Sequence, residues 1–113
     1  MTQVFYEHTP PFTEFTVAGH CNAGKINGID LCCCAVSMLV FTVMESLSAM
    51  KLKNFKSSYS GGWCHIRFEN SSEDADKAKI VLSAIMKGFG LLEKTYPSNI
   101  KISKPQKGGM NNE

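Results

Sequence analysis

The segment GHCNAGKINGIDLCCCAVS, residues 19–37, is where a strand-rich beginning gives way to a long apolar helix. It starts with Gly19 and His20, continues through a loop that contains Gly24 and Gly28, and reaches three consecutive cysteines. Asp30 stands directly before the apolar run, where a short carboxylate side chain is typical of a helix N-cap. The segment therefore predicts a strand end, a flexible loop and a helix start, in that order.

A long helix is expected from the Asp30 cap to about Met50, because apolar residues recur there at helical spacing. Phe41 lies on the opposite face, so we expect this helix to be buried on two sides or to lie at a subunit interface. The apolar stripe consists of Cys32, Val36, Leu39, Val40, Val43, Leu47 and Met50.

The segments around this helix predict two strand pairs. Gln3–His8 and Phe12–Gly19 are rich in aromatic and β-branched residues, and the two prolines between them indicate a hairpin turn. His20 directly follows the second of these strands. Residues 54–70, NFKSSYSGGWCHIRFEN, predict a strand, a turn at Ser60-Gly61-Gly62 and another strand.

A second amphipathic helix is expected after this pair, capped by Ser71 or Ser72 and ended near Pro97. NIKIS, residues 99–103, predicts a last short strand. The order β-β-α-β-β-α-β favours an α+β fold, with two long helices packed on one face of a mostly antiparallel sheet. Residues 1–102 are interpreted as a single domain and residues 103–113 as a disordered tail.

Composition excludes some functional classes. The chain has 113 residues and a net charge of +2, which is too mild to argue for nucleic acid binding. Its longest apolar run, residues 31–44, is shorter than the roughly 20 residues that cross a bilayer. Five cysteines, three of them adjacent, do not suit a disulfide framework. We therefore expect a cytoplasmic protein with reduced thiols and no membrane contact.

The cysteine triplet begins the long helix, where free N–H groups and the helix dipole favour a thiolate. His20 is close enough in sequence to take the thiol proton and return it to a leaving group. The same N–H groups are candidates to hold an oxyanion. Zinc sites use ligands at wider spacing, so neither a metal nor another cofactor is expected. The alternatives are a metal-binding protein and a non-enzymatic protein whose cysteines only pack.

The motifs resemble those of the bacterial ribosomal-processing cysteine proteases, the Prp family. Gly19-His20, a glycine-containing loop and GIDLCCCAVS are similar to the Gly-His and the Gly-x-Asp-(Ile/Leu)-(Val/Cys)-Cys-Ala-x-x-Ser of that family, with Cys34 at the position of the Ala. GGWCHIRF, residues 61–68, is similar to its Gly-Gly-x-x-x-Ile-Arg strand. The order of elements agrees up to about Ile102.

The resemblance implies a homodimeric α+β protease with a Cys/His pair. Such an enzyme removes a short N-terminal extension, with adjacent phenylalanines at the cut, from a large-subunit ribosomal protein. The implied partners are therefore the N-terminal region of a ribosomal protein precursor, as substrate, and a second copy of the chain. No membrane and no direct nucleic acid contact is required. The resemblance leaves a non-enzymatic ribosome-associated protein as the alternative.

Carried over position by position, the resemblance makes His20 the base and Asp30 its possible orienter. Counting from Asp30 gives Cys33 as the nucleophile, four residues before Ser37. The loop between His20 and Asp30 is one residue longer than the resemblance leads us to expect. If this extra residue is placed after Asp30 instead, Cys34 becomes the nucleophile. If the number of residues between the histidine and the nucleophile is held fixed, it is Cys32. On a helical wheel Cys32 faces the core and Cys33 lies at the edge of the apolar stripe, which favours Cys33 with Cys34 second.

The remaining candidates concern substrate binding. The loop from Gly24 to Gly28 is expected either to order over a peptide as a lid or to be a plain mobile connection. Ser37 is expected either near the thiol or only on the helix face.

Overall fold

The computed structural model describes residues 1–103. Within this range the chain forms two helices and five strands in the expected order. Their bounds are β1 Thr2–Thr9, β2 Phe12–Ala18, α1 Leu31–Ser48, β3 Lys56–Ser60, β4 Trp63–Glu69, α2 Ala75–Thr95 and β5 Ile100–Ser103.

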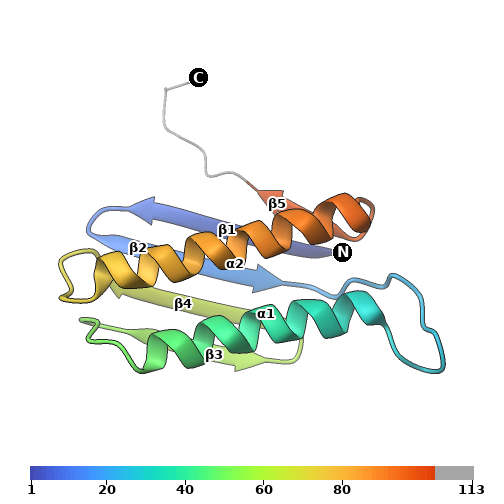
Figure 1. Ribbon diagram of the computed structural model, residues 1–113, viewed down its shortest axis with the longest axis horizontal. Coiled ribbons are helices and arrows are strands. Elements are labelled where there is room, and N and C mark those ends of the chain that lie inside the picture. Colours follow the sequence, from blue (N-terminus) through green and yellow to red (C-terminus); the bar gives the residue numbers. More distant parts are fainter. Residues whose placement is uncertain (104–113) are drawn as a thin grey trace, which may run out of the picture.

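The strands form one sheet in the order β3-β4-β2-β1-β5. All neighbouring pairs are antiparallel except β1 and β5, which run parallel. Both helices lie on the same face of this sheet, α1 toward β3 and α2 toward β1 and β2 (Figure 1). The predicted α+β architecture with a mostly antiparallel sheet is confirmed.

The core forms where the helix-facing side of the sheet meets the two helices. Strand β2 alternates buried and half-buried residues, and its buried side chains include Phe15 and Val17. Phe15 packs against Phe89 of α2 with ring centroids 6.1 Å apart, and Val43 of α1 joins the same cluster. This alternation is what a sheet covered on one face requires.

The start of α2 differs from the prediction of a Ser71 or Ser72 cap. The helix begins at Ala75, with Asp74 at the N-cap position and no side-chain cap hydrogen bond. The Ser72 hydroxyl instead donates to the Glu69 carbonyl and accepts a hydrogen bond from the Lys53 N–H. The Ser72 side chain, which the sequence pattern placed at the helix N-cap, thus hydrogen-bonds between two loops instead. The tail expected from Ser103 lies outside the described residues, apart from Ser103 itself, which ends β5.

Helix α1 is long and apolar enough to cross a membrane by length and composition, with a mean hydropathy of 1.8 over its 18 residues. Single helices of this kind are weak evidence for a membrane span, since core helices of globular domains meet the same criterion. Its Val40, Val43 and Leu47 are buried in the core, whereas Leu31, Met38 and Phe41 are exposed. The expected apolar character on both sides is therefore present, but among residues 1–103 only one side is covered.

Leucines on the two sides of α2 provide a test of this core. Leu82 is fully buried and Leu91 is 65% exposed. We expect Leu82→Ala to lower the free energy of unfolding by about 2–5 kcal/mol, because it removes buried methyl groups and leaves a cavity. Leu91→Ala, the matched control, should change it by less than about 0.5 kcal/mol. Urea unfolding followed by circular dichroism measures both, and equal effects would contradict this packing.

Candidate active site

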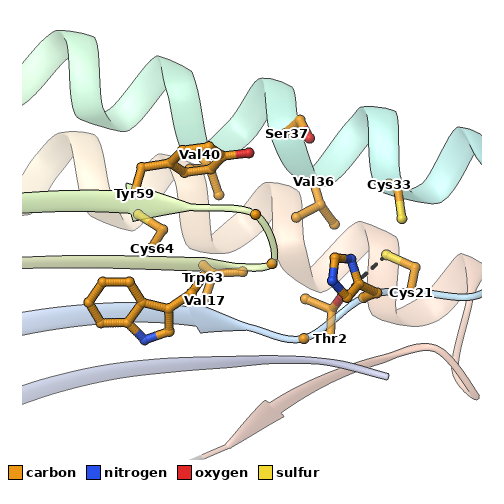
Figure 2. A pocket seen from close by; sticks show the side chains of 14 residues that line it. Thr2, Val17, Cys21, Cys33, Val36, Ser37, Val40, Tyr59, Trp63 and Cys64 are labelled. Carbon is orange, nitrogen blue, oxygen red and sulfur yellow. Dashed lines mark hydrogen bonds between the residues drawn. The ribbon is translucent and has the colours of Figure 1, made fainter.

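A pocket of about 240 Å³ opens between the start of α1 and the β3–β4 turn (Figure 2). Three of the candidate residues, His20, Cys33 and Ser37, line it together. Gly61 and Gly62 of the turn form part of its wall. Residues from three separate regions of the chain therefore meet at one concave site, which is the usual setting for catalytic groups.

The segment that carries His20 leaves β2 through a position that only glycine fits. Gly19 has a φ of +98°, and a Cβ there would lie 2.2 Å from the Met1 carbonyl oxygen. The Gly19 N–H donates to the Gly62 carbonyl at 2.8 Å. The Gly-His pair thus has a physical basis, since the glycine lets the chain turn closely past the N-terminus and present His20 to the pocket.

The His20 imidazole packs directly on Gly62 of the β3–β4 turn. Gly62 has a φ of +79°, and a Cβ at this position would lie 2.6 Å from the His20 Nε2 atom. Gly61, next to it, has open space around its own position. The sequence pattern identifies the two glycines only as a turn, whereas the structure shows that one of them leaves room for the imidazole.

Two residues from the chain ends fix the segment that follows His20. The Asn99 side-chain amide donates to the Cys21 carbonyl at 2.9 Å and to the Asn22 carbonyl at 3.2 Å. The Thr2 hydroxyl and the Cys21 sulfur lie 3.3 Å apart. Sequence reasoning missed Thr2 and Asn99, because a single polar residue far along the chain gives no local signal of such a contact.

The three adjacent cysteines have different surroundings. Cys32 is fully buried, Cys33 is half-buried and Cys34 is exposed. Of the three, Cys33 is the one that lines the pocket with His20. The prediction that Cys32 faces the core is confirmed. Figure 2 shows Cys33 projecting from the first turn of α1, with Val36 and Ser37 one turn further on.

Asp30 caps α1 as expected. Its carboxylate accepts hydrogen bonds from the Cys33 N–H at 3.1 Å and from the Ala23 N–H at 2.9 Å. These bonds, with that of Cys33 first, hold the pKa of Asp30 below its usual value. The Cys33 N–H is therefore already occupied, contrary to the expectation that the first-turn N–H groups are free for an oxyanion. A role for Asp30 in orienting His20 stays a prediction.

The proposed lid contributes to a different pocket. Gly24 lines a second pocket of about 210 Å³ together with Asp30 and Cys32, and Gly28 lines neither. Ile26 and Ile29 exchange two backbone hydrogen bonds, of 2.8 and 3.0 Å, across a tight turn at positive φ. The structure thus brings His20, Cys33 and Ser37 together but not the two loop glycines.

Within residues 1–103, no three His, Cys, Asp or Glu side chains form a cluster suited to holding a metal ion.

Comparison with known proteins gives consistent matches. The family model described as cysteine protease Prp matches residues 1–101. A Staphylococcus aureus structure described as the essential ribosomal processing protease Prp with a covalently linked product peptide is 21% identical, with a TM-score of 0.76, and covers 93% of this chain and 100% of that one. The same S. aureus protease with a substrate peptide is 18% identical, with a TM-score of 0.73 and the same coverage.

A third solved structure, SMU.848 from Streptococcus mutans, is 19% identical with a TM-score of 0.63, and the match covers 93% of this chain and 96% of that one. No curated protein sequence matches significantly. The structural matches share the fold, and the family model extends over almost all of the described residues. The chain therefore belongs to the Prp family of cysteine proteases.

Proposed function

We propose that this cysteine protease removes the N-terminal extension of a large-subunit ribosomal protein, with Cys33 as nucleophile and His20 as general base. The observation that carries the residue assignment is the shared pocket, which His20 and Cys33 both line. The ribosomal substrate is supported by family membership and by two structures of one S. aureus protein described as an essential ribosomal processing protease, one of them with a substrate peptide.

In the proposed mechanism, His20 takes the proton of the Cys33 thiol, and the thiolate attacks the scissile carbonyl carbon. The protonated imidazole then gives its proton to the leaving amine, which leaves an acyl group on Cys33. Water, activated by His20, hydrolyses this thioester and frees the enzyme. A half-buried cysteine suits the role, because it is reachable by a peptide and still held by its helix.

The pocket suits a peptide better than a compact small molecule. Its volume of about 240 Å³ is below the range of most drug-sized ligand sites. Tyr59 and Trp63 lie along its wall and are 46% and 42% exposed, so each offers an aromatic surface. We propose that one apolar substrate side chain packs on them. The loop from Gly24 to Gly28, with Ile26 and Ile29 exposed, is proposed to close over the remaining peptide.

The three cysteines allow a direct test of the nucleophile with a peptide that spans the precursor's processing site. Cys33→Ser is expected to abolish cleavage, and His20→Ala to lower kcat/KM by about 10²- to 10⁴-fold through loss of the general base. Cys34→Ser, the matched neighbour, should retain most of the activity, because Cys34 is exposed outside the pocket lining. Mass spectrometry of the products measures cleavage. Full activity of Cys33→Ser would refute the assignment.

Two neighbouring glycines test how His20 is positioned. In Gly62→Ala the new Cβ would meet the imidazole, so His20 must move and kcat should fall about 10- to 100-fold. Gly61→Ala, whose Cβ meets nothing within 4 Å, is the control and should stay close to the parent. Thermal unfolding of both variants separates loss of positioning from loss of fold. An unchanged kcat in folded Gly62→Ala would show that the imidazole position does not limit the reaction.

We further propose that the enzyme is a cytoplasmic homodimer joined through the uncovered side of α1. Support comes from exposed apolar residues on neighbouring turns, since Met38 is 67% and Phe41 46% exposed. The Phe41 ring contacts that of Tyr59 on β3, with centroids 4.9 Å apart. Together they form an apolar strip beside the pocket, of the kind that homodimer interfaces bury.

Sedimentation velocity tests the dimer. Phe41→Glu places a charge in the strip and is expected to shift the protein to a monomer. Ile80→Glu, on α2, is the matched control, because Ile80 is 70% exposed and lies on the other helix. A parent protein that sediments as a monomer at tens of micromolar, or a Phe41→Glu variant that remains dimeric, would rule out this interface.

A further inference from the structure

Three thiols gather around the base of the pocket, although the proposed mechanism uses one. Cys21 and Cys32 are buried in a small apolar cluster with Ile100, and the half-buried Cys33 packs against it. Cys21 and Cys33 also line the pocket together. Figure 2 shows the two side chains at the same end of the pocket, Cys21 on the segment after β2 and Cys33 on α1, and His20 lines this pocket with them.

The three thiols differ in reactivity. Burial raises the pKa of Cys21 to about 12, and burial likewise raises the pKa of Cys32, so both remain protonated near neutral pH and are much weaker nucleophiles than a thiolate. Cys33 is the thiol of this group that the pocket opens to solvent. An oxidant that enters the pocket therefore meets Cys33 first.

Only one of the two neighbouring thiols has suitable geometry to react with an oxidised Cys33. Cys32 is its sequence neighbour on a helix, where consecutive side chains diverge and a disulfide would be strained. Cys21 comes from a different segment and approaches Cys33 from across the pocket. The segment around it is fixed by Asn99 and Thr2, so Cys21 is held near Cys33 in the folded enzyme.

We propose that Cys21 is a resolving thiol, which forms a reversible disulfide with Cys33 when a hydroperoxide oxidises the active site. The role of Cys33 as the reactive thiol rests on the proposed function, but the disulfide itself can be detected without any substrate. The bond blocks the nucleophile, and reduction by a dithiol restores it.

The chemistry balances in two steps. The Cys33 thiolate attacks the outer oxygen of the hydroperoxide, the O–O bond breaks, and the departing alkoxide or hydroxide takes a proton. Sulfur is oxidised to sulfenic acid and the peroxide is reduced. Cys21 sulfur then bonds to Cys33 sulfur, the S–O bond breaks, and the hydroxide leaves as water with the Cys21 proton. Because a protonated thiol attacks slowly, the second step is the slower one.

Peptide mapping of the full chain tests the disulfide. The protein is treated with hydrogen peroxide, blocked with N-ethylmaleimide and digested with trypsin without reduction. Cleavage after Lys25 separates Cys21 from the triplet, so a disulfide between them joins peptide 1–25 to peptide 26–51. Fragmentation should place the bond at Cys33. Dimedone added with the peroxide should trap sulfenic acid on Cys33 and lower the yield of the joined peptides.

Variants then separate the thiols. Cys21→Ala, confirmed folded by circular dichroism, should give no joined peptides, and its Cys33 should proceed to sulfinic acid. Cleavage by the oxidised parent should return after dithiothreitol, whereas cleavage by oxidised Cys21→Ala should not. Cys34→Ser should still form the bond, since Cys34 is exposed on another side of the helix.

Some outcomes would overturn the proposal. A parent protein that goes directly to sulfinic acid, or a bond that maps to Cys32 or Cys34, excludes Cys21–Cys33 pairing. If the bond forms but no variant of Cys33 affects peptide cleavage, the proposed nucleophile is wrong while the thiol pair stands. If Cys33 is needed for cleavage and no bond forms, only the resolving role fails.

Discussion

The hydrogen bond from the Gly19 N–H to the Gly62 carbonyl joins the two halves of this fold at the point where chemistry is expected. One partner ends the strand before His20, and the other closes the turn between β3 and β4. The His20 imidazole packs on that same Gly62, so the bond holds the residue before His20 directly against the turn on which the imidazole lies. A side chain at either glycine would collide with a neighbouring group, so the site depends on two positions that carry no functional group.

The helix start forms the opposite wall, and Asp30 controls it in a similar way. Its carboxylate joins Ala23 of the loop to Cys33 of the helix through two N–H groups. This arrangement fixes Cys33 relative to the segment that carries His20. It also places a negative charge beside the helix start, which opposes the stabilisation that the helix dipole offers a thiolate. The position of Cys33 is thus fixed at the expense of part of the electrostatic stabilisation that a thiolate there would receive.

Much of the fold could be predicted from local patterns. Three signals depend only on residues that are close together in the sequence. They are the alternation in β2, the helical spacing after Asp30 and the glycine turn before Trp63. The start of α2 could not be predicted, because Ser72 bonds to Lys53 of a distant loop instead of capping the helix. At the site, the helical wheel correctly predicted that Cys32 is buried. No pattern of neighbouring residues indicated that Gly62 leaves room for His20, or that the Asn99 side chain bonds to the Cys21 carbonyl.

Asn99 determines when, during synthesis of the chain, the segment after His20 becomes fully fixed. Its side chain holds the carbonyls after His20, and its own carbonyl accepts the Thr2 N–H, at the start of β1. The first and last parts of the described chain therefore meet beneath the pocket. A nascent chain still lacking this residue contains His20, Cys33 and the Thr2 and Asp30 side chains, but not the hydrogen bonds to the carbonyls of Cys21 and Asn22. His20 and Cys33 are therefore synthesised well before Asn99, and the segment after His20 gains its full set of contacts only once Asn99 has left the ribosome.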